Sequence, residues 1–123
     1  MIASSIVWIL VVSGIITGAA GLAACVAPRP LLRLAFGVDA AADATLFFAR
    51  HWGVLIFAVG ALTVFSAYAP ATRMPILAAA ALEKIAVVAL IFFGPLKRTP
   101  AMTAIAASDG IFAVLYLAYL AGL

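Results

Sequence analysis

Six side chains that can carry charge or share a proton lie in stretches of the chain that are otherwise apolar. They are Arg50, His51, Glu83, Lys84, Asp109 and Tyr116. Three interpretations are open: the charges fix how helices pack, they form a pocket for a ligand, a proton or an ion, or they contact a partner subunit. Tyr116 follows Asp109 by seven residues, about two helical turns, so we expect both on one helix face.

Depth along the predicted helices indicates which of these groups meet. At about 1.5 Å per residue, Arg50 and Asp109 lie at the most similar depths, so we expect them to pair. Glu83 is expected to bond His51 or to lie near Lys84. Alternatively, the long side chain of Lys84 can extend along its own helix and place its charge at the membrane surface.

Other kinds of site find little support in the sequence. With one histidine and one cysteine, the chain cannot assemble the usual nitrogen and sulfur ligands of a metal site, and it cannot ligate a haem through two histidines. It has no glycine-rich phosphate loop and no evident catalytic set. Most of its basic residues lie in short loops beside apolar stretches, which argues against a nucleic-acid surface. We therefore expect no metal, no cofactor and no nucleic-acid partner.

Four long apolar stretches must position the six side chains. Of the 123 residues, 69% are hydrophobic and 9% are charged, which is too apolar for a soluble domain of this size. A bilayer-spanning helix needs about 20 such residues. The expected spans are Ser4–Val26, Ala44–Tyr68, Pro75–Phe93 and Thr99–Leu120. The sequence predicts an all-α, polytopic membrane protein, one domain over residues 1–123, whose four transmembrane helices form an antiparallel bundle in the lipid bilayer.

Two further patterns concern the assembly of this bundle. Arg29 and Arg33 alternate with leucines after the first span, which predicts a short interfacial helix closed by Gly37. Pairs of glycines on one face of the first and second spans allow another helix to come close. These residues are Gly14, Gly18, Gly53 and Gly60. The close approach can lie within the monomer or at the seam of a homo-oligomer.

The distribution of lysine and arginine predicts the orientation. The first and third loops hold Arg29, Arg33, Lys97 and Arg98, whereas the second loop holds Arg73 alone. The positive-inside rule places the first and third loops in the cytoplasm. Both termini are then expected on the opposite side.

Four segments follow one another along the chain: LLRLAFG, FFARHWGVLIFAVGAL, ALEKIAVVAL and SDGIFAVLYLAYL. Their order is similar to that of small four-helix membrane proteins of the DoxX-like kind. The resemblance is one of layout: a basic residue opens the second span, and the third and fourth spans each contain an acidic residue. It implies a multi-pass protein of the bacterial inner membrane, and some members associate with larger oxidoreductase assemblies. It assigns no catalytic residue.

Three functions are hypotheses at this stage. The first is a small non-catalytic subunit, accessory or structural, of a larger membrane complex, because four spans without a catalytic set leave little else. The second is a binder or carrier of a small hydrophobic or acidic molecule, such as a quinone or a lipid, in a cytoplasm-facing pocket formed by Arg50, His51, Glu83 and Asp109. The third is proton-coupled transport, with Glu83 or Asp109 carrying the proton.

Overall fold

The computed structural model describes residues 2–123, which form five α-helices and a short 3-10 turn, with no strand in that range. The elements are α1 (Ile2–Val26), α2 (Pro28–Phe36), α3 (Asp43–Tyr68), η1 (Pro70–Thr72), α4 (Arg73–Phe93) and α5 (Pro100–Leu120). Four helices, α1, α3, α4 and α5, are long and apolar enough to cross a membrane. The predicted all-α fold with four spans is confirmed, and the chain is a multi-pass membrane protein.

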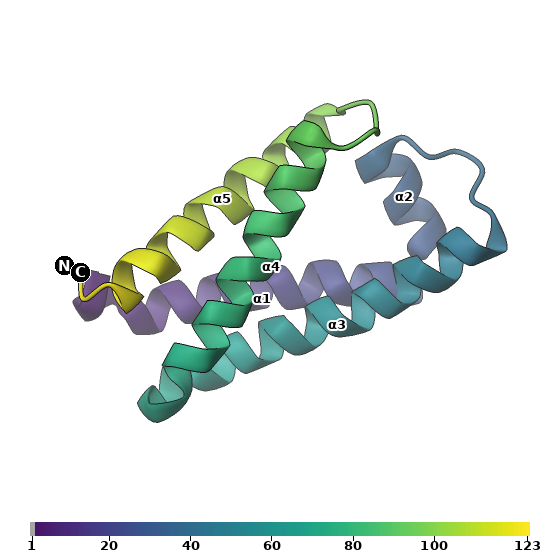
Figure 1. The fold of residues 1–123 in the computed structure, drawn as a ribbon. Helices are drawn as coiled ribbons and strands as arrows, with labels where there is room; N and C mark the ends of the chain where they lie inside the picture. The colour runs from purple at the N-terminus through teal and green to yellow at the C-terminus, as the bar shows by residue number, and fades with distance from the viewer. Residues whose placement is uncertain (1) are drawn as a thin grey trace.

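The long helices form two antiparallel pairs. Helix α1 packs along α3, and α4 packs along α5, whereas contacts between the two pairs are few. The pairs meet near the two termini and the α3–α4 turn, which we call the closed end, and they diverge toward α2 and the α4–α5 loop, which we call the open end (Figure 1). The bundle is therefore a wedge, with α2 beside its wide side.

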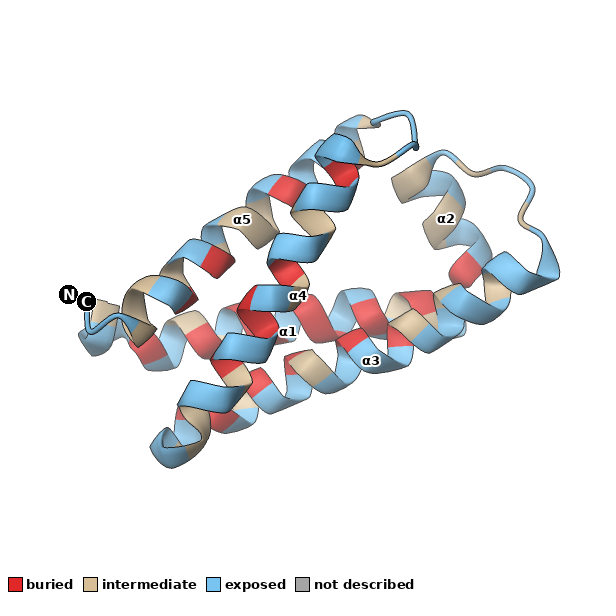
Figure 2. Cartoon of the chain, in the orientation of Figure 1, coloured by how far each residue is buried: buried red, intermediate tan, exposed pale blue. Residues whose placement is uncertain are grey.

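Glycine brings the backbones of α1 and α3 into direct contact. A Cβ atom on Gly60 would lie 2.6 Å from the carbonyl oxygen of Gly14, and one on Gly53 would lie 2.5 Å from that of Gly21. A Cβ atom on Gly18 would find ordinary contact, 3.9 Å from the Cα atom of Gly60. Buried residues gather where these two helices face each other (Figure 2). All four glycines singled out in the sequence lie at this seam, which is inside one chain.

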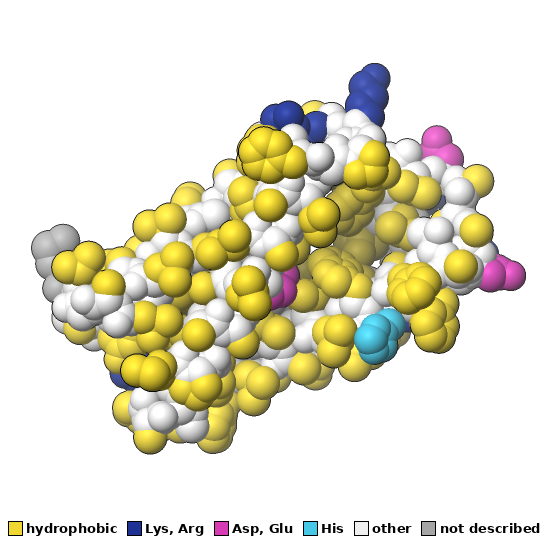
Figure 3. Space-filling view, viewed as in Figure 1, with side chains coloured by type: hydrophobic (Ala, Val, Ile, Leu, Met, Phe, Trp, Pro, Cys, Tyr) yellow, Lys and Arg dark blue, Asp and Glu magenta, His cyan; other side chains and the backbone are white. Residues whose placement is uncertain are grey.

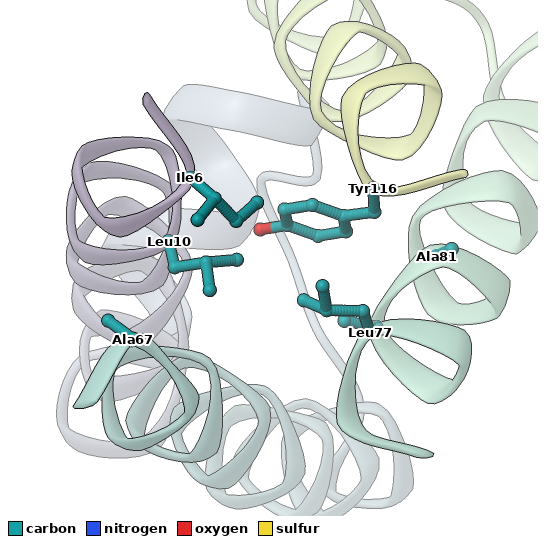
Figure 4. Close-up of a cluster of buried hydrophobic side chains, with 7 residues drawn as sticks. Ile6, Leu10, Ala67, Leu77, Ala81 and Tyr116 are labelled. Carbon is teal, nitrogen blue, oxygen red and sulfur yellow. The ribbon is translucent and has the colours of Figure 1, made fainter. Parts of the chain in front are cut away.

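An apolar core around Tyr116 fills the closed end. This side chain of α5 is fully buried. Its ring points toward Ile6 and Leu10 of α1 and lies near Leu77 of α4 (Figure 4). The hydroxyl donates a hydrogen bond to Ser13 Oγ of α1. Tyr116 thereby connects both helix pairs.

Arg73 adds a polar connection at the closed end. Its Nε donates to the carbonyl oxygen of Ser66 at 2.9 Å, and its Nη2 donates to that of Ala67 at 2.8 Å. Its Nη1 donates to the hydroxyl of Tyr119 at 3.1 Å. The last carbonyls of a helix lack partners within it, and a cation there also meets the negative end of the helix dipole. Arg73 thus completes the end of α3 and ties it to α5.

At the open end, α2 is held by a threonine and by Phe36, which packs against the buried Met102 and Ala106 of α5. Helix α2 begins at Pro28 and ends at Phe36, and its C-cap is Gly37, whose φ of 69° suits a residue without a side chain. Thr99 Oγ1 donates to the carbonyl oxygen of Ala35 at 2.6 Å. Thr99 Oγ1 also accepts a hydrogen bond from the backbone N–H of Met102 at 3.1 Å, so Thr99 is the N-cap of α5. The predicted short helix is therefore present, and its last turn is fastened to the start of α5.

The outward faces of the long helices are apolar. Large exposed hydrophobic side chains occur on all four spans, for example Trp8, Phe47, Phe93 and Ile111. Figure 3 shows hydrophobic side chains covering much of the visible face. In a bilayer these side chains contact acyl chains, so their exposure does not require a protein partner.

Candidate functional site

An ion pair inside the wedge joins α4 to α5. Lys84 Nζ lies 2.8 Å from Asp109 Oδ1 and donates a hydrogen bond to Thr17 Oγ1 of α1 at 2.9 Å. It also lies 5.8 Å from the centre of the Phe112 ring. Only 1% of the Lys84 residue is exposed. Lys84 therefore holds three helices together at one buried point.

The sequence of α4 explains why a lysine stands there. Leu77, Ala80, Ala81 and Lys84 share the buried face of this helix, at the three- and four-residue spacing of one helical side. The backbones of α1 and α4 do not come into contact. Lys84 lies beyond the closed-end core, toward the side where the pairs diverge. Its four-carbon stem reaches across that separation to Thr17.

Glu83 brings a second carboxyl group to the same place. Its Oε2 atom is buried and has no hydrogen-bond partner. Together, Lys84, Asp109 and Glu83 form a cluster of one cation and two carboxyl groups. A buried polar atom without a partner is unfavourable by about 1–3 kcal/mol. The Oε2 atom is therefore free to form a hydrogen bond with a ligand.

A pocket of about 300 Å³ lies next to this cluster. Five of its lining residues are polar or charged: Thr17, Glu83, Lys84, Ser108 and Asp109. The other lining residues are apolar and include Leu31 and Phe36 of α2 and Trp52 of α3. Figure 3 shows the surface hollowed at the open end, with hydrophobic side chains around the hollow. The space is polar along one wall and apolar elsewhere.

Arg50 is not a member of the cluster. Its Nη1 donates to the carbonyl oxygen of Cys25, near the end of α1, at 2.8 Å, and the side chain is exposed. The predicted ion pair between Arg50 and Asp109 is therefore wrong. The reason is rotation about the axis of α3. Gly53 faces α1, and Arg50, three residues earlier, lies about 60° from it and so also turns toward α1 rather than α5.

The expected partners of Glu83 and Lys84 also need correction. His51 is exposed on α3, and Glu83 Oε2 has no hydrogen-bond partner, so the expected bond between these two residues is wrong. Lys84 does not follow its own helix to the membrane surface, because its ammonium group finds two oxygen partners inside the bundle. Tyr116 bonds Ser13 in the closed-end core instead of the charged cluster.

Sequence reasoning missed Thr17, Ser108 and Trp52 as parts of this site. A signal for the first was present: Ser13 and Thr17 are four residues apart in a span without any charge. Hydroxyl groups in lipid-embedded helices turn inward, where they can find partners. In the structure Ser13 meets Tyr116, and Thr17 meets Lys84.

Fold and site together define a four-span helical membrane protein with a small, partly polar pocket between its helices. Among residues 2–123, no group of three or more histidine, cysteine, aspartate or glutamate side chains is placed to hold a metal ion. Comparison of the chain with models of known families, with characterised proteins and with solved structures finds no match. The resemblance to DoxX-like proteins stays a prediction.

Proposed function

We propose that this protein binds a small, mainly apolar molecule in the pocket between its helices, as a membrane-embedded binding or carrier protein. The observation that carries the proposal is the pocket of about 300 Å³ beside the unpartnered Oε2 of Glu83. Apolar walls with a few convergent polar groups are typical of small-molecule sites, and the volume lies at the lower end of their range.

The size of the pocket limits its occupant. At about 30 Å³ for each water-sized group, it holds roughly ten non-hydrogen atoms. The ring of a quinone or one end of a lipid fills this space, and the remainder of a longer molecule would lie outside it. The apolar walls suit the body of such a molecule, and the wall formed by Glu83 and Ser108 suits its polar end.

A purely structural role accounts for less of the site. The pair of Lys84 and Asp109 by itself would fix the register of α4 and α5. It requires neither a second carboxyl group nor an unfilled space. An accessory-subunit role therefore ranks behind ligand binding. Proton-coupled transport would use the same Glu83 and is the second proposal, supported by the position of this carboxyl group beside the pocket.

Binding can be tested with 4-ethylbenzyl alcohol, a neutral molecule of suitable size. The protein is reconstituted in phosphatidylcholine nanodiscs, and the Trp8→Phe background leaves Trp52, on the pocket wall, as the reporter of fluorescence. We expect a saturable change. Ala104→Phe, which places a ring in the pocket, is expected to weaken binding at least tenfold.

The matched control is Ala107→Phe, since Ala107 is exposed on the same helix and does not line the pocket. It is expected to bind the alcohol as the background protein does. A fluorescence change that fails to saturate, or that is identical in Ala104→Phe and in the background, would count against a binding pocket.

We also propose that the open end faces the cytoplasm of a bacterial inner membrane, with both termini on the opposite side. Four basic residues support this orientation, and they lie in α2 and the α4–α5 loop: Arg29, Arg33, Lys97 and Arg98. These two segments are close together, because Phe36 and Lys97 line one surface depression. The loop at the closed end contains one basic residue, Arg73. The bacterial membrane is supported by the DoxX-like layout.

Cysteine labelling tests the orientation in a Cys25→Ala background. Ala40→Cys lies between α2 and α3, and Ala71→Cys lies in η1, and both positions are exposed. With a membrane-impermeant maleimide on intact spheroplasts, we expect labelling at position 71 alone. Lysis is expected to permit labelling at position 40. The reverse pattern would invert the topology.

A further inference from the structure

We infer that the ligand of this pocket carries a cationic group, such as an organic ammonium, and that Glu83 is the residue that binds it. The inference rests on the proposed function and specifies the chemical class of the ligand. It starts from the charges of the cluster, which do not balance within the chain.

Lys84 is committed to other partners. Its ammonium group has three protons; one goes to Asp109 Oδ1 at 2.8 Å and one to Thr17 Oγ1 at 2.9 Å. The ring of Phe112 lies on a further side, 5.8 Å away. Adjacent residues on a helix point about 100° apart, so Glu83 reaches the cluster from a different side of α4 and shares none of these bonds. Its Oε2 atom correspondingly has no hydrogen-bond partner.

The other cations that lie within the spans are occupied elsewhere. Arg50 bonds the carbonyl oxygen of Cys25 on α1, and His51 is exposed. Arg73 is fixed at the closed end by Ser66, Ala67 and Tyr119. Among the described residues of the spans, no cation other than its neighbour Lys84 is placed near Glu83.

The pocket supplies the position from which an external cation would reach Glu83. Glu83 and Asp109 both line it, and the other lining side chains are largely apolar. An anionic ligand would meet two carboxyl groups and a lysine that is already paired. A ligand with an ammonium group and an apolar body would instead place its charge on Glu83 and its body against Trp52 and Leu31. Ligand charge, more than ligand shape, is therefore the property that this wall selects.

Three probes of nearly equal shape test the inference in neutral phosphatidylcholine nanodiscs. They are 4-ethylbenzylamine, 4-ethylbenzyl alcohol and 4-ethylbenzoate, which differ mainly in charge. We expect the amine to bind at least tenfold more tightly than the alcohol, and the benzoate to bind most weakly. This ranking uses the unmutated cluster, so it does not depend on how any variant folds.

Glu83→Gln assigns the preference to one side chain. We expect this variant to bind the alcohol as before and to lose the tenfold preference for the amine. Asp43→Asn is the matched control, because Asp43 is an exposed acid at the start of α3, outside the pocket. It is expected to retain the preference. A preference that persists in Glu83→Gln would overturn the assignment.

The inference and the proposed function fail differently. Saturable binding of the alcohol without any preference for the amine overturns the inference and leaves the proposed function standing. Lack of saturable binding for all three probes overturns both.

Discussion

Lys84 and Glu83 are neighbours on α4, yet removing their charges is expected to change stability by very different amounts. Lys84→Met deletes the bonds to Asp109 at 2.8 Å and to Thr17 at 2.9 Å. It leaves two carboxyl groups without a cation. Removing one partner of a buried ion pair lowers the free energy of unfolding by about 3–5 kcal/mol, and we expect a loss in this range.

Glu83→Gln removes a carboxylate that has no hydrogen-bond partner at its buried oxygen. We expect the free energy of unfolding to stay within about 1 kcal/mol of the wild-type value, or to rise, because the unpaired group was itself unfavourable. A stabilised variant that loses ligand preference would be typical of a binding residue, since such residues are often held in unfavourable surroundings.

The double variant Lys84→Met/Asp109→Asn isolates the ion pair. It removes the cation together with one of the two acids, so we expect a loss of about 2 kcal/mol, clearly smaller than that of Lys84→Met alone. Unfolding is followed in mixed micelles by titration with dodecyl sulfate, using Trp52 fluorescence, with circular dichroism to verify that the helices persist. Equal losses in Lys84→Met and Glu83→Gln, or additive losses in the double variant, would refute the assigned pairing.

Two further pairs of substitutions can be measured in the same titration. Gly60→Ala is expected to lower the free energy of unfolding by about 1–3 kcal/mol, because its Cβ atom would lie 2.6 Å from the Gly14 carbonyl oxygen. Gly18→Ala, with ordinary contact, is expected to be neutral or to stabilise by up to about 1 kcal/mol; similar losses in both variants would contradict the close seam. Arg73→Gln is expected to lower it by about 2 kcal/mol, since most of three hydrogen bonds are lost. Arg50→Gln breaks one bond at an exposed position, so a change within about 0.5 kcal/mol is expected; equal losses at the two arginines would show that Arg73 does not connect the helices.

The positions of the helices could be predicted from the sequence. Each predicted span boundary lies within two residues of the observed one. Long apolar stretches interrupted by proline, glycine and charge leave few other structures in a membrane, because the backbone must satisfy its own hydrogen bonds there. The short helix was equally evident, since Arg29 and Arg33 alternate with leucines before Gly37.

The site could be predicted only in part, because depth is one coordinate and rotation about the helix axis is another. The predicted ion pair between Arg50 and Asp109 uses only their depth in the membrane. Gly53 and Gly60 lie on one face of α3 and indicate which side of this helix packs closely against a neighbour. That neighbour is α1, and Arg50 consequently turns toward Cys25.

The wedge shape could not be read from the sequence. Whether four apolar helices close into a filled bundle or diverge depends on the crossing of α1 with α3 and on the contacts at one end. Those contacts include the bond of Tyr116 to Ser13 and that of Arg73 to Tyr119, and both join residues that are far apart in the chain. The pocket beside Glu83 is a result of that divergence, so no local pattern could have predicted it.

The two hydrogen bonds of the Thr99 hydroxyl use different parts of the same group. Its proton goes to Ala35, and an oxygen lone pair receives the N–H of Met102. If α2 swings outward, it breaks the first bond and the packing of Phe36 against Met102 and Ala106, but it does not uncap α5. The N-cap of α5, the helix that carries Asp109, therefore does not depend on the position of the segment that borders the pocket.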